Sequence, residues 1–264
     1  MIPMLVLKIG GSMAERSGRL AEEIAALGEK IVIVHGGGPQ VSALEKATGR
    51  EPRYVFSKDG FKTRHTDSGT MENFVMAVGG GVNSLLVRQF RKAGVNAVGI
   101  SGASGIVFAK RKILVSFENG REKIIRDDFS GKIQEIDSAP LLALLQAGFV
   151  PVVSPIALGE EFEALNVDGD RAAAAMAGRL KAEKLLLFTD VEGFFSDFPN
   201  GLVRSARKSD IAEFQKKASA GMKRKLVAAG EALEGGVQEV VICSGLGENP
   251  MKKALEGGGT HITK

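Results

Sequence analysis

Residues Leu5–Ser12 read LVLKIGGS, an apolar run that contains one lysine, Lys8, and ends in two glycines. Such a run predicts a buried strand of a parallel sheet, where a charged side chain needs a specific reason. Taken alone, the stretch is equally typical of a strand end whose lysine extends its ammonium group to water. A second turn of similar composition, HGGGP at His35–Pro39, favours the other interpretation. Glycine turns leave backbone N–H groups uncovered, which suits the close approach of an anion.

The order of the predicted elements indicates an α/β fold. The chain begins with a strand, a helix, a strand and a helix, and this alternation predicts a parallel sheet with right-handed crossovers. Strands are expected at 4–9, 31–35, 95–100, 150–154, 184–189 and 239–243. Helices are expected at 19–27, 39–48, 69–92 (loosened at Gly79–Gly81), 139–147, 171–180, 209–215 and 222–234. A natural boundary near Glu160–Leu165 divides the chain into two lobes, 1–165 and 166–264.

Between 106 and 126 the apolar pattern changes to a period of two. Three short antiparallel strands are expected there, at 106–109, 113–117 and 122–126, with Asn119-Gly120 as a hairpin turn. Basic side chains gather in this segment: Lys110, Arg111, Lys112, Arg121, Lys123 and Arg126. A second basic stretch contains Arg50, Arg53, Lys58, Lys62 and Arg64. Such stretches are usually solvated surface, and the functional alternative is a docking face for an acidic partner.

Composition excludes several classes of function. The 264 residues are 44% hydrophobic and 25% charged, with a net charge of +4, as in an ordinary soluble protein. Aromatic residues make up 6%, without tryptophan, so stacking platforms for single-stranded nucleic acid are not expected. No apolar segment is long enough to cross a membrane and no signal peptide is recognisable, so we expect a cytoplasmic protein. Cys243 is the one cysteine, which excludes an internal disulfide and a multi-cysteine zinc site.

The common phosphate-binding motifs are missing from the sequence. There is no G-x-x-x-x-G-K-[ST], and no G-x-G-x-x-G followed by an acidic residue on the next strand. Lys8 with Gly10-Gly11, together with Gly36–Gly38, would supply a third kind of phosphate site. No Ser/His/Asp arrangement is present, and His35 is interpreted as a packing or turn residue. A carboxylate acceptor needs no general base, because it is already ionised at neutral pH.

Six stretches in order along the chain resemble the amino acid kinase family. They are KIGGS at 8–12, HGGGP at 35–39, Arg64 in a G-x-x-x-R-x-T setting, NVDGD at 166–170, TDVEG at 189–193 and GMKRK at 221–225. Within the family the pattern is similar to N-acetylglutamate kinases and, more closely, to kinases acting on aminoadipate or glutamate held by a LysW-like amino-group carrier protein. The resemblance implies a three-layer αβα sandwich with a mainly parallel central sheet.

The resemblance also implies roles for single residues. Lys8 and Lys225 would stabilise the transferring phosphoryl group, and Asp170 would hold both lysines in place. Substrate binding is implied for Gly36, Gly37, Arg64 and Asn166, and phosphate or nucleotide binding for Gly10, Gly11, Gly38 and Asp190. An additional structural role is open for two of them: Asn166 as a helix N-cap and Asp190 as a turn residue. Lobe 1–165 would hold the amino acid and carrier, and lobe 166–264 the ATP.

The activity implied is ATP-dependent phosphorylation of the side-chain carboxylate of a carrier-linked aminoadipate or glutamate. The alternatives are phosphorylation of free N-acetylglutamate and a module that senses amino acids or nucleotides without turnover. ATP would come with Mg²⁺, and no dedicated protein metal site is expected. The expected partners are an acidic carrier protein and a second copy of the chain in a homodimer. Neither nucleic acid nor a membrane is an expected partner.

Overall fold

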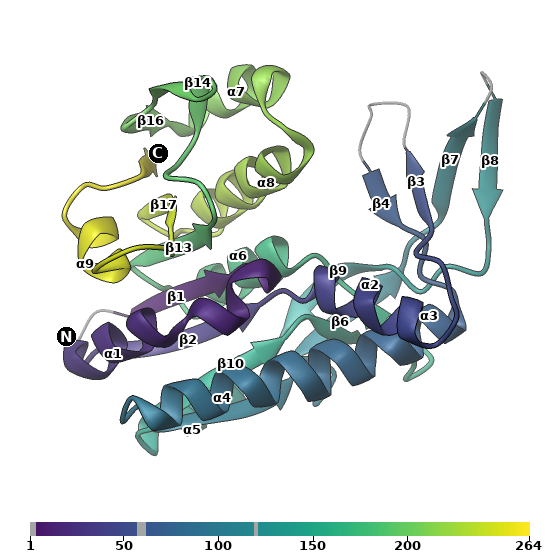
Figure 1. The fold of residues 1–264 in the computed structure, drawn as a ribbon, viewed down its shortest axis with the longest axis horizontal. Coiled ribbons are helices and arrows are strands. Elements are labelled where there is room, and N and C mark those ends of the chain that lie inside the picture. Colours follow the sequence, from purple (N-terminus) through teal and green to yellow (C-terminus); the bar gives the residue numbers. More distant parts are fainter. Residues whose placement is uncertain (1–3, 57–61, 119–120) are drawn as a thin grey trace.

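The strand predicted from LVLKIGGS, β1 (Met4–Ile9), lies in the middle of the central sheet (Figure 1). A computed structural model describes residues 4–56, 62–118 and 121–264. The sheet has eight strands in the order β16-β18-β17-β13-β1-β2-β10-β5, and within it only β18 runs antiparallel to a neighbour, β17. Its other members are β2 (Lys30–His35), β5 (Ala97–Ser101), β10 (Val150–Ser154), β13 (Lys184–Thr189), β16 (Ser205–Arg207), β17 (Glu239–Ser244) and β18 (Thr260–Thr263). The mainly parallel sheet is confirmed.

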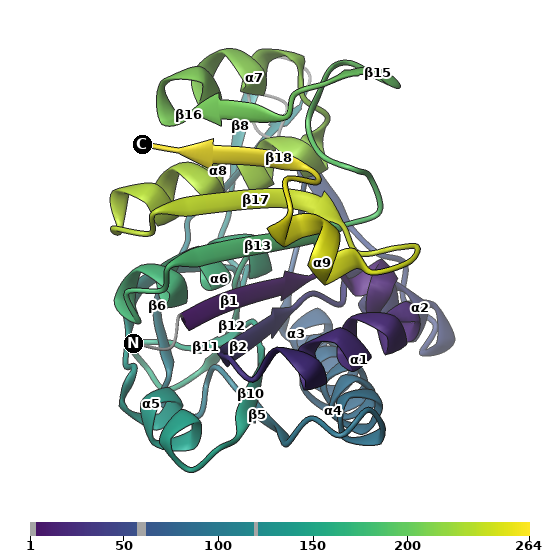
Figure 2. The same ribbon diagram turned by 90° about the vertical axis from the view of Figure 1, so that its left-hand side faces the viewer.

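Helices cover both faces of this sheet, which confirms the three-layer sandwich. One face packs against α1 (Gly18–Leu27), α4 (Asn83–Lys92) and α9 (Pro250–Leu255). The other face packs against α5 (Ala139–Gln146), α6 (Gly169–Arg179) and α8 (Ala220–Glu234). Figure 2 looks onto the sheet with α1 and α9 in front of the strands. Strands from both sides of the predicted boundary between 165 and 166 form one sheet. The division into two lobes stays a prediction.

Alternation along β1 decides which layer Lys8 faces. Successive side chains of a strand point to opposite faces of the sheet. Leu5 and Leu7 are buried in the cluster with α1, α4 and α9, whereas Val6 is buried in the cluster with α5, α6 and α8. Lys8 shares its parity with Val6. The ammonium group is therefore directed toward the layer that contains α6 and α8.

The glycine run at 79–81 does not interrupt its helix. A continuous helical segment comprises α3 (Ser68–Phe74), a π-helix (Val75–Val82) and α4. The expected loosening is thus a change to the wider π-helical turn, a form that often occurs near functional sites. Asp67 caps the start of α3, and its carboxylate accepts a hydrogen bond from the backbone N–H of Thr70 at 2.8 Å.

Strands form close to all three positions predicted after residue 106, but they belong to two separate sheets. β6 (Val107–Arg111) pairs instead with β9 (Gly131–Ile136), in a four-stranded sheet with β11 (Ile156–Leu158) and β12 (Ala164–Asn166). Only β7 (Leu114–Glu118) and β8 (Arg121–Ile125) form the projecting hairpin, beside a second hairpin of β3 (Tyr54–Phe56) and β4 (Lys62–Arg64) (Figure 1). Lys110 and Arg111 therefore belong to the four-stranded sheet. The expected turn at Asn119-Gly120 lies outside the described residues.

Several short elements have no counterpart among the predictions, because elements of three to six residues carry little periodic signal. Besides β3, β4, β9, β11, β12, β16, α9 and β18, these are a 3₁₀ helix (Gly11–Arg16), β14 (Phe195–Asp197) and β15 (Asn200–Leu202). The predicted helix at 39–48 is α2 (Gly38–Ala47), and that at 209–215 is a 3₁₀ turn (Lys208–Asp210) followed by α7 (Ile211–Lys217). Among the described residues, no helix has the length and apolarity needed to cross a membrane.

The contact between two glycine turns generates a stability prediction. A Cβ atom on Gly11 would lie 2.7 Å from the backbone nitrogen of Gly37, so Gly11→Ala forces backbone to move. We expect this variant to lower the free energy of unfolding by about 1–3 kcal/mol, the usual cost of overpacking. Gly18→Ala is the matched control, because nothing lies within 4 Å of a Cβ atom there. Urea denaturation of both variants measures the difference, and equal stabilities would contradict the tight contact.

Candidate active site

Two lysines and one aspartate from three different elements meet in one buried cluster. Lys8 on β1 and Lys225 on α8 both contact Asp170, the second residue of α6. The Lys8 Nζ lies 2.8 Å from Asp170 Oδ1, and the Lys225 Nζ lies 3.1 Å from Asp170 Oδ2. All three side chains are at most 10% exposed. The predicted trio is thus assembled from residues that lie more than 50 positions apart.

Burial and charge act in opposite directions on this cluster. Burial raises the pKa of the Asp170 carboxyl, but the two ammonium groups outweigh burial and hold that pKa at about 2. Burial lowers the pKa of Lys8, but the charge and hydrogen bond of Asp170 outweigh it, so the pKa stands above its ordinary value. Burial and the neighbouring Lys8 cation together lower the pKa of Lys225. The site therefore holds concentrated positive charge in a desolvated place, where it acts strongly on an anion.

The glycine turns that follow β1 and β2 touch each other through their backbones. Gln40 Nε2 donates to the carbonyl oxygen of Gly11 at 2.9 Å, and the N–H of Val41 donates to the carbonyl oxygen of Gly37 at 3.0 Å. Within the described part of the chain, the backbone N–H groups of Gly11, Gly37 and Gly38 meet no acceptor. These donors lie at the carboxyl ends of parallel strands and at the start of α2, a favourable position for an anion.

Gly36 and Gly10 each form a backbone hydrogen bond within the fold, and Gly36 does so through its N–H. The N–H of Gly36 donates to the carbonyl oxygen of Ile9 at 2.9 Å, so it is already used within the fold. The carbonyl oxygen of Gly10 accepts from the N–H of Met13 at 3.0 Å, at the start of the 3₁₀ helix. Both glycines thus tie the turns to their surroundings.

Arg64 lies at the end of β4, next to the Gly38 turn. Its Nη1 donates to the carboxylate of Glu45, and its Nη2 donates to the Gly38 carbonyl at 3.1 Å, Ser42 Oγ at 2.7 Å and Tyr54 Oη at 2.9 Å. The guanidinium group therefore fixes the first turns of α2 to the β3–β4 hairpin. Its predicted contact with a substrate stays a prediction.

Asn166 and Asp190 lie at the ends of β12 and β13. Asn166 ends β12, four residues before Asp170, and its Nδ2 donates to Thr66 Oγ1 at 3.0 Å. The N-cap of α6 is Asp168 rather than Asn166, and its carboxylate accepts from the N–H groups of Asp170 and Arg171. Asp190 is exposed directly after β13 and accepts from Thr189 Oγ1 at 3.1 Å, which agrees with a turn residue.

Sequence reasoning missed Glu45, a carboxylate buried in α2. Its two oxygens accept from Arg64 and from Thr70 Oγ1, the latter at 3.0 Å. A signal was present, because Glu45 follows the fully buried Val41 by four residues and therefore shares its apolar helix face. A charge on such a face indicates a buried partner, but the sequence does not identify Arg64 as that partner.

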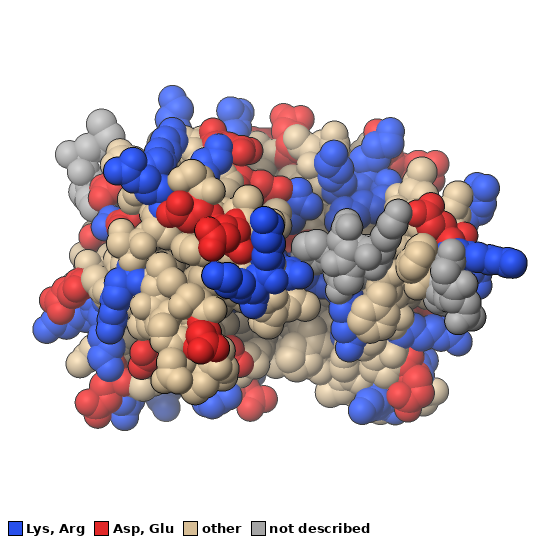
Figure 3. Space-filling view, turned by 90° about the horizontal axis from the view of Figure 1, so that it is seen from above, with Lys and Arg blue, Asp and Glu red and all other residues tan. Residues whose placement is uncertain are grey.

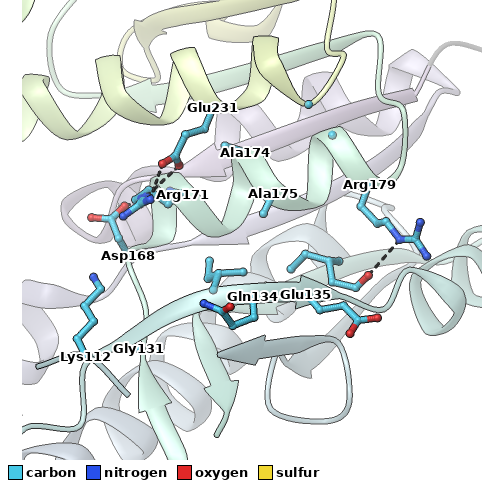
Figure 4. Close-up of a pocket in the computed structure, with 14 residues that line it drawn as sticks. Lys112, Gly131, Gln134, Glu135, Asp168, Arg171, Ala174, Ala175, Arg179 and Glu231 are labelled. Atoms are coloured by element: carbon cyan, nitrogen blue, oxygen red, sulfur yellow. Dashed lines mark hydrogen bonds and ion pairs between the residues drawn. The ribbon is translucent and has the colours of Figure 1, made fainter. Parts of the chain in front are cut away.

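A cavity of about 420 Å³ lies beside the cluster, between α6, α8 and β9 (Figure 4). At one end it is lined by Lys112 and Asp168, and farther along by Arg171, which bonds Glu231 through two nitrogens. Burial and the charge of Arg171 lower the pKa of Lys112. Lys8 and Lys225 are not among the lining residues, so this cavity adjoins the cluster without containing it.

The donor set of the cluster does not fit a protein-bound metal ion. Both oxygens of Asp170 are occupied by ammonium groups, and Asp168 is engaged as a helix cap. Among the described residues, no group of three or more His, Cys, Asp or Glu is arranged to hold a metal.

Removing the charge of Asp170 tests the electrostatics of the cluster. Asp170→Asn leaves two buried ammonium groups without a counter-ion, which should lower the free energy of unfolding by about 3–5 kcal/mol. Because the folded pKa of Asp170 is depressed, its contribution is complete above the unfolded value of about 3.9 and is lost as the pH falls toward about 2. Denaturant titrations at several pH values should show the gap to wild type shrinking below about pH 4.

Asp190→Asn is the control for that series, because it removes an exposed carboxylate. We expect a change within about 0.5 kcal/mol for this variant at every pH. A pH-independent gap for Asp170→Asn would contradict the assignment of a buried, ionised carboxylate.

Comparison with known proteins agrees with this geometry. The sequence profile of the amino acid kinase family matches residues 3–244. The [LysW]-aminoadipate kinase of Thermus thermophilus is 39% identical over 268 residues, which cover 98% of this chain and 100% of the relative. The [LysW]-aminoadipate/[LysW]-glutamate kinase of Sulfolobus acidocaldarius is 39% identical over 266 residues, with coverage of 98% and 100%.

A solved structure shares the fold of this chain. An N-acetylglutamate synthase from Neisseria gonorrhoeae, solved with coenzyme A and N-acetyl-glutamate, superposes with a TM-score of 0.82 at 26% identity. The superposition covers 99% of this chain but 59% of the synthase. The family profile, the relatives of similar length and the buried lysine–aspartate–lysine cluster agree, and this chain belongs to the amino acid kinase family.

Proposed function

We propose that this chain uses ATP to phosphorylate the side-chain carboxylate of 2-aminoadipate or glutamate held on an acidic amino-group carrier protein. Membership in the amino acid kinase family supports phosphoryl transfer from ATP. The buried cluster of Lys8, Asp170 and Lys225 is the observation that carries the proposal, because phosphoryl transfer requires positioning and cationic stabilisation above all. Two relatives of nearly equal length, named as kinases of [LysW]-linked substrates, support the choice of acceptor.

In the proposed reaction a carboxylate oxygen of the acceptor attacks the γ-phosphorus of ATP. A bond forms between that oxygen and phosphorus, the bond to the β–γ bridging oxygen breaks, and the products are an acyl phosphate and ADP. No proton has to be removed, because the acceptor is ionised at neutral pH. Lys8 and Lys225 stabilise the negative charge that spreads over the transferring group, and Asp170 keeps the two ammonium groups in place.

The glycine turns take the phosphates and the acceptor carboxylate in this proposal. The N–H groups of Gly11, Gly37 and Gly38 are preorganised donors, so they need no rearrangement during the reaction. Arg64 and Asn166 border the turns and hold the other polar groups of the substrate. Asp190, at the end of β13, contacts the nucleotide, so that 166–264 forms the ATP lobe.

Mg²⁺ would enter with ATP. This ion usually keeps several waters and is held in kinases by substrate phosphates and few protein ligands. Since the carboxylates at the cluster are occupied by the protein's own cations and N–H groups, we assign no residue of this chain to the metal.

The carrier is proposed to dock on the projecting β7–β8 hairpin and the segment after it. Arg121, Lys123 and Arg126 are exposed, and none of them forms an ion pair with a described residue. Basic side chains show at the end of the molecule where the hairpins project (Figure 3). Arg111 is unsuited to this role, because its guanidinium packs 4.0 Å from the ring of Phe129 and donates to the carbonyl of Asp128. An acidic partner would be attracted by the exposed set.

Free N-acetylglutamate is the second candidate acceptor. The same lysines, aspartate and glycines would serve it, but it needs no exposed basic hairpin. A sensing module without turnover is the third candidate. Because a synthase shares this fold, the fold alone does not specify an activity. The complete cluster of Lys8, Asp170 and Lys225 favours an enzyme over a sensor. For each of the three candidates we propose that the chain forms a homodimer.

A comparison of acceptors tests the proposed activity. ADP release should be fast with carrier-bound aminoadipate or carrier-bound glutamate and slow with free N-acetylglutamate. Lys8→Met, which keeps the length of the side chain without its charge, should lower kcat by about 10²–10³-fold. Faster turnover of the free compound would favour the alternative, and ADP release by none of the three would refute the kinase proposal.

Charge reversal tests the docking surface. Changing Arg121, Lys123 and Arg126 together to Glu should raise KM for the carrier-bound substrate at low salt, with little effect on kcat. The effect should weaken toward about 1 M salt, because screening shortens the reach of surface charges. The control changes Lys30, Lys216 and Lys253, which are exposed basic residues on β2, α7 and α9. Equal KM values in both triple variants would argue against this surface.

A further inference from the structure

His35 is a buried titratable residue for which the proposed reaction has no use. It ends β2 immediately before the glycine turn and is 0% exposed. Its Nδ1 lies 2.9 Å from the carbonyl oxygen of Gly36, and its Nε2 lies 3.0 Å from Nδ2 of Asn83 on α4. A carbonyl only accepts and an amide nitrogen only donates, so Nδ1 carries the proton and Nε2 accepts. The imidazole thus connects the glycine turn to α4.

The imidazole stays neutral at ordinary pH. Burial lowers the pKa of His35 to about 4; the hydrogen bond to Gly36 opposes this shift, and the charge of Lys8 adds to it. The pattern of one donating and one accepting nitrogen requires this neutral form, because a charged ring would donate from both.

Asn83 is itself held from two further sides. Its Nδ2 also donates to the carbonyl oxygen of Val152 on β10, at 2.8 Å. On β5, a Cβ atom at Gly99 would lie 2.0 Å from Oδ1 of Asn83, so only a glycine leaves room for the amide. Asn83 follows the π-helix directly, at the first residue of α4. Its amide therefore rests on β10 and β5, and it presents a fixed donor to His35.

The hydrogen bond to Gly36 matters because of peptide geometry. The carbonyl of Gly36 and the N–H of Gly37 belong to one planar trans peptide, so they point in opposite directions. Glycines on both sides would let this plane rotate easily. Holding the carbonyl oxygen of Gly36 toward His35 therefore aims the N–H of Gly37 away from it. That N–H is one of the donors without an acceptor among the described residues.

We propose that His35 and Asn83 are positioning residues, which hold the Gly36–Gly37 peptide so that the N–H of Gly37 faces the bound anion. The inference rests on the proposed phosphoryl transfer for the identity of that anion. It adds a function for two residues that touch no reacting atom. The neighbouring carbonyls of Gly37 and Gly38 are held separately, by Val41 and Arg64, so His35 is responsible for this single peptide.

A series of variants at His35 tests the proposal. Asn in place of His35 keeps an N–H near the position of Nδ1, whereas Gln keeps an amide near Nε2 and Leu keeps neither. We expect kcat/KM to fall by about 10- to 100-fold in His35→Leu and His35→Gln, the range for groups that orient functional residues, with recovery to within a few-fold in His35→Asn. The kcat/KM of Asn83→Leu should lie between those of His35→Leu and His35→Asn, because the imidazole keeps its bond to Gly36 but loses its hydrogen bond from Asn83.

Ser17→Ala is the matched control. Ser17 is 0% exposed and bonds Gln89 of α4, but it does not contact the glycine turns. Its variant should lose stability in urea without a loss of kcat/KM. If the His35 variants lost as much stability as Ser17→Ala but kept the kcat/KM of wild type, the proposal would be overturned and His35 would have a purely structural role. Equal activities of His35→Asn and His35→Leu would also overturn it.

A spectroscopic measurement separates this proposal from the proposed function. In ¹⁵N-labelled wild-type protein, His35 should show one neutral tautomer with the proton on Nδ1 between about pH 5 and 8, and Asn83→Leu should mix the tautomers. A proton on Nε2 would overturn the positioning role even in an active enzyme. If no acceptor is phosphorylated but the tautomer is as expected, the proposed function fails while the hydrogen-bond arrangement stands.

Discussion

The carboxylate of Asp170 between two ammonium groups is the interaction on which the site depends. Two lysines buried side by side would repel each other, and each would lose its hydration. One shared carboxylate offsets both effects, at Nζ–O distances of 2.8 and 3.1 Å. The same contact ties β1, α6 and α8 together. The cluster is therefore at once a local store of positive charge and a tertiary contact between parts of the chain that are remote in sequence.

The second constraint is the close approach of the glycine turns. Gly11 and Gly37 touch through their backbones, and Gly37 also packs against Val78 on the π-helix. A side chain on Gly11 would push the two turns apart, and a side chain on Gly37 would push its turn away from Val78. These two glycines are therefore needed for close backbone packing as much as for backbone flexibility. This is why the long helix contributes to the shape of the anion site.

The location of both features follows from the order of strands. The chain adds β2 on one side of β1 and later adds β13 on the other, so the direction of winding reverses at β1. Turns that follow neighbouring parallel strands come together at their carboxyl ends, and such reversal points are the usual binding sites of open α/β sheets. The N-terminus of α6 reaches the same edge, next to the end of β2, and brings Asp170 into contact with Lys8.

Local patterns in the sequence determined the α/β class and the main parallel strands with their helices, because periodicity acts between near neighbours. The resemblance of the motifs to the amino acid kinase family implied the lysine–aspartate–lysine cluster. Only the tertiary structure decided that β6 pairs with β9, that Glu45 holds Arg64, and that Asn83 supports His35. Each of these depends on groups from separate segments meeting in space. Their local sequence is compatible with several partners, and burial within the completed fold selects one.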